Sequence, residues 1–197
     1  MIHNRYMNAP PLLKVQDLQL SRSPELPPLQ LQVAIPPGLT AVTGGEQAGK
    51  TTLLKALHDP SSTRHSHWQG HRAAWLDLSL PGYDQQTARE VWASFWANPS
   101  DQNLQAHFIQ KWDMAPHIDK PVYMLSKGHR RKVGLVALLA ANHPITCLDM
   151  PYAALDMRSI DVLRAYLKDA ALDATRAWVI ADYEADEQLT WTQIVSL

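Results

Sequence analysis

The pattern of hydrophobic and polar residues predicts two strands near the start of the chain and a third soon after them. Residues 13–20 alternate between apolar and polar side chains, and residues 29–35 do so strictly. The segment between them contains three prolines and is expected to be a turn. A third apolar run covers residues 39–43. This opening predicts an antiparallel β subdomain ahead of a buried strand.

Longer helical patterns and short apolar runs follow along the rest of the chain. Apolar residues recur with helical spacing over residues 88–96, 104–112, 128–142 and 157–171. Apolar runs of strand length cover residues 73–76, 145–148 and 177–181. The run over residues 177–181 is predicted to be the last core strand. Strands that alternate with helices are typical of an α/β fold with a mostly parallel sheet.

The composition is that of a globular protein without a strong charge bias. The chain has 197 residues, of which 46% are hydrophobic and 19% charged, and its net charge is −1. The length suits one domain with its own core, and the charge gives no reason to expect nucleic acid as a partner. Because no apolar run reaches membrane-spanning length and the start lacks a secretory stretch, a cytoplasmic location is expected. The single cysteine, Cys147, is expected to be buried.

The most specific motif follows the third strand. Residues 44–51 read Gly-Gly-Glu-Gln-Ala-Gly-Lys-Thr, and a helical run continues from there. A glycine loop between a strand and a helix matches the Walker A loop, whose backbone amides and helix N-terminus bind a polyphosphate. Lys50 is expected to reach the β- and γ-phosphates, and Thr51 to bind Mg²⁺. An ordinary glycine turn is the alternative, but it gives no reason for the Lys-Thr pair. The expected nucleotide contacts are Gly44, Gly45, Glu46, Gln47, Ala48, Gly49, Lys50, Thr51 and Thr52.

Two segments further along the chain narrow the family. Residues 125–129 read Leu-Ser-Lys-Gly-His, whereas residues 148–156 begin with Leu-Asp-Met-Pro and end with Ala-Leu-Asp. From about Leu12 to the C-terminus, the chain resembles the ATP-binding subunits of ABC transporters. Residues 125–129 are similar to the Leu-Ser-Gly-Gly-Gln signature of that family, Leu-Asp-Met-Pro to its Walker B motif Leu-Asp-Glu-Pro, and Ala-Leu-Asp to its D-loop. The order of these motifs is more specific than any one of them.

The resemblance implies a fold, a domain organisation and partners. The fold would be a P-loop NTPase core of the ABC ATPase type, a mostly parallel sheet flanked by helices, with an N-terminal antiparallel β subdomain and a helical insertion. Residues 1–11 would be a lead-in, residues 12–197 the ATP-binding domain, and residues of about 84–142 its helical subdomain. ATP and Mg²⁺ would bind between two such subunits, identical or homologous, docked on the cytoplasmic side of an integral-membrane permease.

The resemblance also assigns roles to residues after the Walker A loop. Asp149 would hold Mg²⁺ together with Thr51. Ser126 and Gly128 would contact the nucleotide of the second subunit, and Asp156 would lie near the interface between the subunits. The residues alone leave a simpler interpretation open, in which Ser126 and Gly128 only begin a helix and Asp156 caps the next one.

The groups that handle water and the γ-phosphate in this family are changed. Met150 stands where the Walker B motif has its catalytic glutamate, and a thioether cannot act as a general base. Asp77 stands near the Q-loop glutamine position, Tyr183 is the nearest counterpart of the switch histidine, and Gln47 replaces a loop glycine. No aromatic residue near positions 21–23 is available to stack on adenine. Nucleotide binding is therefore expected to persist, and hydrolysis by this chain alone is expected to be slow.

Two other clusters of polar residues could be interpreted as binding sites, but the sequence favours a simpler explanation for each. His65, His67 and His71 invite a zinc interpretation, but no cysteine or carboxylate nearby completes a ligand set, so a polar hairpin is predicted. The basic residues 130–132 are predicted to form a solvated helix face rather than a nucleic-acid site.

The leading hypothesis is an ATP-binding subunit of an ABC-type membrane transporter, in which nucleotide closes a dimer and so biases a separate permease. The alternative is a degenerate, non-hydrolysing ABC subunit with a regulatory or scaffold role, which Met150 motivates. A soluble P-loop kinase or an ABC protein without a transport role is favoured least, because no acceptor-binding feature supports the kinase. The transported substrate is not encoded in any recognisable motif.

Overall fold

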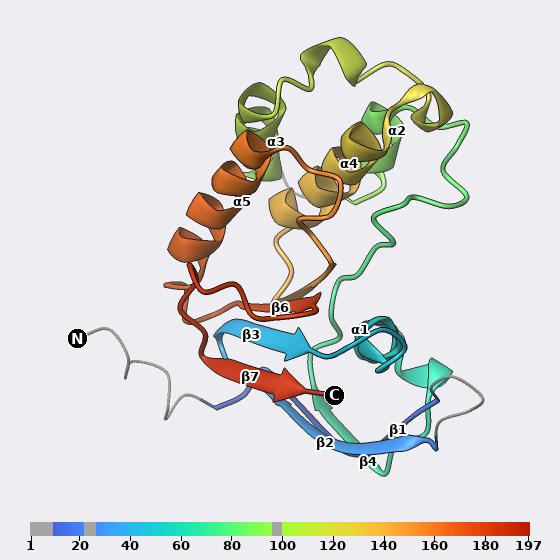
Figure 1. Cartoon of the computed structure of the whole chain (residues 1–197), viewed down its shortest axis with the longest axis vertical. Coiled ribbons are helices and arrows are strands. Elements are labelled where there is room, and N and C mark those ends of the chain that lie inside the picture. The colour runs from blue at the N-terminus through green and yellow to red at the C-terminus, as the bar shows by residue number, and fades with distance from the viewer. Residues whose placement is uncertain (1–9, 22–26, 96–99) are drawn as a thin grey trace. The chain divides into compact units, whose positions relative to one another are not determined.

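The computed structural model describes residues 10–21, 27–95 and 100–197 (Figure 1). The chain forms two compact units, which are described separately. The core unit contains the described residues up to Trp75 together with His143–Met150 and Arg164–Leu197. The helical unit contains Leu76–Asn142 and Pro151–Leu163. Within the described ranges, no helix combines the length and apolar character that crossing a bilayer requires.

The core unit begins with a three-stranded antiparallel sheet. Its central strand β1 pairs with β2 on one side, with Leu13 opposite Ile35 and Leu20 opposite Leu29, and with β4 on the other. The strands are β1 (Leu13–Leu20), β2 (Leu29–Ile35) and β4 (His67–Gly70). The two alternating runs near the start of the chain are therefore confirmed as paired strands. The prediction of a polar hairpin around His65 to His71 was wrong, since this segment adds strand β4 to the edge of the sheet.

The second sheet of the core unit is parallel, in the order β5-β6-β3-β7. Figure 1 labels three of its strands, β6, β3 and β7. Its strands are β5 (Ile145–Asp149), β6 (Ala177–Asp182), β3 (Gly38–Thr43) and β7 (Gln193–Ser196). The sequence pattern predicted β6 as the last strand of the core, and this was wrong, because β7 follows it in the chain and pairs with β3 at the edge of the sheet. Residues 73–76 do not form the predicted strand either. Ala74 makes only a single bridge, to Thr146.

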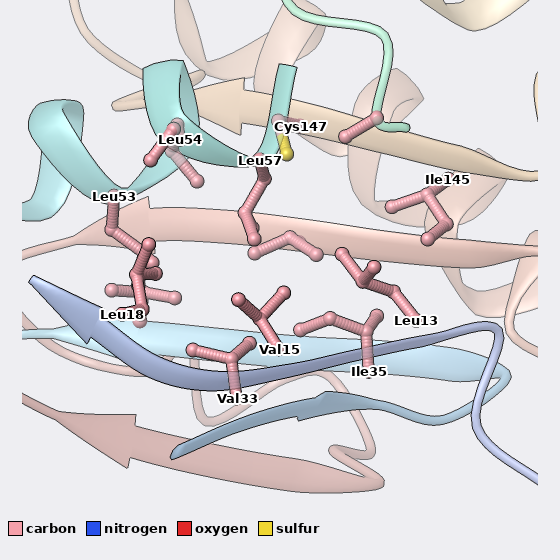
Figure 2. Packing of buried hydrophobic residues seen from close by; sticks show 14 of the residues in the cluster. Leu13, Val15, Leu18, Val33, Ile35, Leu53, Leu54, Leu57, Ile145 and Cys147 are labelled. Atoms are coloured by element: carbon pink, nitrogen blue, oxygen red, sulfur yellow. The ribbon is translucent and has the colours of Figure 1, made fainter. Parts of the chain in front are cut away.

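Helix α1 (Lys50–His58) joins the hydrophobic core of this unit. Its side chains Leu53, Leu54 and Leu57 are buried in a cluster with residues of β1, β2 and β5 (Figure 2). Cys147 belongs to this cluster, as expected, and burial raises the pKa of its thiol far above the ordinary range. The packing fixes α1 against the strands and so sets the position of the loop that precedes the helix. A short 3₁₀ turn, η1 (Pro60–Ser62), follows α1.

The helical unit is organised around helix α4, which packs against α2 and α3. Trp92 of α2 is buried and donates its indole N–H to the Val133 carbonyl of α4 at 2.9 Å. The elements of the helical unit are α2 (Ala88–Ala93), α3 (Ser100–Lys111), η2 (Ala115–His117), η3 (Val122–Met124), α4 (Lys127–Ala140) and the first part of α5 (Met157–Ala170). The end of the helix predicted over residues 88–96 reaches the segment 96–99, which lies outside the described residues. The predicted fold class, a parallel α/β core with an antiparallel subdomain and a helical insertion, is confirmed.

Candidate nucleotide-binding site

The Walker A segment forms a turn that carries the chain from β3 into α1. Gly49 precedes the helix with φ 104°, a left-handed conformation that glycine adopts at little cost. The N-cap residue Gly49 has no side chain with which to cap α1, so the backbone N–H groups of the first turn favour an anion. Gln47 also has a positive φ, 61°, at a position where the family resemblance predicted a glycine. The loop therefore keeps its turn even with a non-glycine residue in the left-handed region.

Lys50 is folded back over this loop. Its Nζ donates hydrogen bonds to the carbonyls of Gly44, at 2.5 Å, and Gly45, at 2.7 Å. The ammonium also lies 4.8 Å from the centre of the Tyr183 ring, and only 8% of the residue is exposed. Tyr183 reaches this place because β6 pairs with β3 and ends beside the loop. Lys50 is thus a nearly buried cation that two short hydrogen bonds hold directly at the loop.

Thr51 and Asp149 meet at the carboxyl end of the parallel sheet. The Thr51 hydroxyl donates to Asp149 Oδ2 at 2.6 Å, across 98 residues of sequence. Asp149 ends β5, and Thr51 is in the first turn of α1, so the fold of the core unit brings the two together. Hydroxyl and carboxylate oxygens are the ligand types that Mg²⁺ prefers. The donor set therefore fits a magnesium ion beside the loop.

A cavity of about 580 Å³ opens over these groups. Lys50, Thr51 and Asp149 all line it, so the cation, the hydroxyl and the carboxylate face one space. Its other lining residues are Ser21, Glu46, Gln47, Ala48, Gly49, Thr52, Met150 and Tyr183. The structure thus places most of the Walker A residues that were predicted from the sequence around a single cavity. Gly44 and Gly45 take part through their carbonyls, which hold Lys50.

Among the residues that the family resemblance marked as changed, Met150 and Tyr183 line this cavity, and Asp77 does not. Met150 lines it and has φ 44°, and its N–H donates to the Ala181 carbonyl at 2.8 Å. Tyr183 also lines it, whereas Asp77 lies in the helical unit, where its carboxylate accepts from the Ser79 amide and hydroxyl. In the part of the chain that the structure describes, the carboxylates that line the cavity are Asp149 and Glu46.

The signature segment begins helix α4 in the helical unit. Ser126 is the N-cap, and its Oγ accepts from the His129 amide at 3.2 Å. The same oxygen lies 2.8 Å from His129 Nδ1, and the His129 ring packs on His117 with 4.0 Å between the ring centres. Burial lowers the pKa of both histidines, with a further lowering by nearby lysines. Ser126 does begin a helix, as the simpler interpretation held, and the residue is exposed at the start of α4.

Gly128 is required by a close approach of the D-loop segment. A Cβ at this position would lie 2.7 Å from the Ala154 carbonyl oxygen. We expect Gly128→Ala to lower the free energy of unfolding by about 1–2 kcal/mol, because the clash outweighs the better helix propensity of alanine. Urea denaturation measures the change. Gly45→Ala is a matched control, since no described residue has an atom within 4 Å of the Cβ position at Gly45. Equal losses of stability in both variants would contradict the steric argument.

Asp156 has a structural partner that the sequence did not reveal. Its carboxylate accepts from the Ser159 amide, at 2.8 Å, and caps helix α5. It also pairs with Lys132 at 3.1 Å, and the Lys132 side chain is only 10% exposed. The prediction of a solvated basic face over residues 130–132 was therefore wrong for Lys132. Arg130 also differs, since its guanidinium donates to the Leu125 and Tyr123 carbonyls.

These contacts predict an acid-sensitive contribution to stability. The hydrogen bond from the Ser159 amide is the main cause that lowers the pKa of Asp156 to about 2, against an ordinary 3.8. A lowered folded-state pKa stabilises the fold above pH 4, and the stabilisation is lost as the pH falls toward 2. Because the carboxylate is 60% exposed, screening reduces the effect to about 0.5 kcal/mol between pH 5 and pH 3.

Urea titrations at pH 5 and pH 3 measure this contribution. Asp156→Asn keeps a capping oxygen without the charge, so the variant should lose less stability than the unsubstituted chain over that range. Asp169→Asn, which removes a carboxylate from the other end of α5, should leave the pH response unchanged. A response that Asp156→Asn does not reduce would show that other carboxylates dominate.

Three contacts, one at the Walker A cavity and two around the start of α4, could not be predicted from the sequence. They join residues far apart in the chain: Tyr183 to Glu46, Lys132 to Asp156, and His117 to His129. Each depends on how the elements within one unit pack. The aromatic Tyr183 could have been noticed at the end of a core strand, but nothing in the pattern indicates its partner.

Comparison with known proteins agrees with this geometry. Residues 30–153 match the family model described as ABC transporter. The chain is 32% identical over 160 residues to the "Cytochrome c biogenesis ATP-binding export protein CcmA" of Maricaulis maris, covering 75% of this chain and 74% of that protein. It is 30% identical over 195 residues to the protein of the same name from Bordetella parapertussis, covering 89% of this chain and 84% of that protein.

Solved structures support the fold. A structure described as the ATP-binding subunit of an ABC transporter superposes with a TM-score of 0.73 at 17% identity, covering 86% of this chain and 79% of that chain. A putative ABC transporter ATP-binding protein from Pyrococcus furiosus gives 0.68 at 20% identity, covering 94% and 96%. None of these relatives is described as a scaffold or regulator, so they give no support to the degenerate alternative. The chain belongs to the ABC transporter family, as an ATP-binding subunit.

Proposed function

We propose that the core unit binds ATP with Mg²⁺ in the cavity over the Walker A loop, and that the chain powers an export complex through a separate integral-membrane permease. The observation that carries the proposal is the convergence of Lys50, Thr51 and Asp149 on one cavity. The relatives named as cytochrome c biogenesis export proteins support an exporter of the same class.

Each of these residues has a defined task in the proposed complex. The loop amides and the N-terminus of α1 bind the phosphates, and Lys50 exchanges its carbonyl partners for the β- and γ-phosphate oxygens. Thr51 and Asp149 hold Mg²⁺, directly or through its water shell. The ion neutralises part of the phosphate charge when it is bound. Thr52 adds a second hydroxyl at the start of α1.

The helical unit supplies the second half of the proposed site. Ser126 and Gly128 at the start of α4 would contact the nucleotide of a second ATPase subunit, identical or homologous, and Asp156 would lie near the interface. The exposed position of Ser126 at a helix N-terminus supports this role. ATP binding then favours a closed dimer, and closure shifts the conformation of the permease through differential affinity for its two states. The dimer is held at the cytoplasmic face of the membrane by the permease.

Hydrolysis is proposed to be slow in the isolated chain. Met150 lines the cavity where a general base is needed, and loss of such a base costs about 10²–10⁴-fold in rate. In a dimer with a competent ATPase subunit, turnover would instead take place at the partner's site, which has its own glutamate and would receive Ser126 and Gly128 from this chain.

Equilibrium dialysis with ATP and MgCl₂ tests the first part of the proposal. We expect retention of ATP that EDTA weakens, because Thr51 and Asp149 would lose the ion between them. If the folded chain retains neither ATP nor a slowly hydrolysed analogue, the assignment of the site is overturned. Pull-down of the tagged chain from solubilised membranes tests the second part, since a co-purifying integral-membrane protein is expected and a purely soluble set of partners would contradict the transport role.

A further inference from the structure

A tyrosine and a glutamate meet across the opening of the Walker A cavity. Tyr183 follows strand β6, and its hydroxyl donates to Glu46 Oε1 at 3.3 Å. The same tyrosine accepts at its backbone carbonyl from the Gly44 N–H, at 3.4 Å, and lays its ring 4.8 Å from Lys50 Nζ. Tyr183 therefore touches the beginning, the middle and the end of the loop.

Both partners are accessible to a ligand. Tyr183 is 46% exposed, Glu46 is exposed, and both line the 580 Å³ cavity together with Lys50. An exposed hydrogen bond of this length contributes little net free energy. It can therefore be exchanged at small cost for a bond to a bound anion.

A carboxylate at this place competes with a phosphate. A carboxylate and a phosphate are both anionic acceptors, whereas a tyrosine has a single O–H to donate. The charge of Glu46 is the largest cause that raises the pKa of Tyr183, so the phenol is a donor at neutral pH. Glu46 also repels any polyphosphate that Lys50 attracts. Two of the three donor hydrogens of Lys50 Nζ are held by the carbonyls of Gly44 and Gly45.

We propose that Glu46 occupies, in the ligand-free chain, the acceptor place of a terminal phosphate, and that Tyr183 transfers its hydrogen bond from Glu46 to a nucleoside triphosphate. The inference rests on the proposed ATP site and specifies how that site distinguishes nucleotides. A nucleoside diphosphate has no third phosphate to take the hydroxyl, so Glu46 keeps its partner. Glu46 is then a specificity-determining residue that sets the preference for the triphosphate.

Binding of ATP and ADP to four forms of the full chain tests the inference: unsubstituted, Glu46→Gln, Tyr183→Phe and the double variant. Titration calorimetry with the slowly hydrolysed analogue ATPγS, and with ADP, gives the affinities. We expect Glu46→Gln to tighten ATPγS binding about three- to tenfold and ADP binding less than about twofold. In the Tyr183→Phe background, the gain in ATPγS affinity from Glu46→Gln should shrink to about twofold, because only the charge effect remains.

The controls separate this inference from the proposed function. Glu184→Gln removes an exposed carboxylate next to Tyr183 that does not line the cavity, and should change neither affinity. Thermal melts check that each variant folds. Equal tightening of ATPγS and ADP, or an equal gain in both Tyr183 backgrounds, would overturn the exchange while leaving ATP binding intact. Failure of the unsubstituted chain to bind either nucleotide would instead overturn the proposed function.

Discussion

Met150→Glu is expected to raise ATP hydrolysis by the purified chain by about 10²-fold. A general base contributes about 10²–10⁴-fold. We expect the lower end because the family resemblance predicts that two other groups acting on the γ-phosphate are also replaced, by Asp77 and Tyr183. Met150 already lines the cavity beside Asp149. Its backbone is fixed by the hydrogen bond to the Ala181 carbonyl, so a glutamate side chain would start from the same place.

Phosphate release at saturating ATP measures this effect, with ATP affinity determined in parallel. Met150→Gln is the matched control, because it has the length and polarity of glutamate but no basic carboxylate. Both variants share the left-handed backbone at this position, φ 44°, so strain cannot account for a difference between them. A flat rate in Met150→Glu with ATP still bound would mean that the side chain at position 150 does not limit hydrolysis.

Lys50→Ala should weaken ATP binding by more than about 100-fold. A desolvated charge that meets a polyphosphate contributes several kilocalories per mole, and a factor of 100 corresponds to about 2.7 kcal/mol. Lys50 is nearly buried and its ammonium lies at the cavity between the loop carbonyls and the Tyr183 ring. Among the described residues, Lys50 is the only lysine or arginine that lines this cavity, so none of them replaces the lost charge.

Equilibrium dialysis or calorimetry with ATPγS gives the change in affinity. Lys168→Ala, on the exposed side of the last turn of α5 in the same unit, removes the same charge away from the cavity and should bind normally. Melting curves of both variants exclude unfolding as the cause. A Lys50→Ala chain that is folded and binds with undiminished affinity would place the nucleotide elsewhere.

Local sequence patterns were sufficient to predict most of the core unit, because its main strands bury apolar side chains at regular positions. The strands β1, β2, β3, β5 and β6 each carry an apolar pattern, and each was predicted from it. The edge strands β4 and β7 were missed. Their residues are mostly exposed or half-buried, and they are held by backbone hydrogen bonds to β1 and β3, which leave no hydrophobic signature. Ala74 shows the opposite error, because apolar residues there are buried without extending a strand.

The candidate site was also predicted in part from local sequence, whereas the rest depended on the family resemblance or on the structure. The spacing of Gly49, Lys50 and Thr51 after a strand indicated a phosphate loop, since a strand–loop–helix geometry is a local property. The Walker B position of Asp149 rested on the family resemblance, and the hydrogen bond between Thr51 and Asp149 is consistent with that assignment. The Gln47 substitution also shows that the loop tolerates a left-handed non-glycine residue, which a residue pattern does not decide.

By itself, the sequence determined the buried strands, most of the helices, the phosphate loop and the family, because each of their patterns lies in residues close together in the chain. Only the tertiary structure decided that Tyr183 reaches Glu46, that Lys132 is buried against Asp156, and that Gly128 has no room for a side chain. Those contacts join segments separated by between 24 and 137 residues. Their formation depends on the packing of strands and helices around a shared core, and a linear pattern contains no record of that packing.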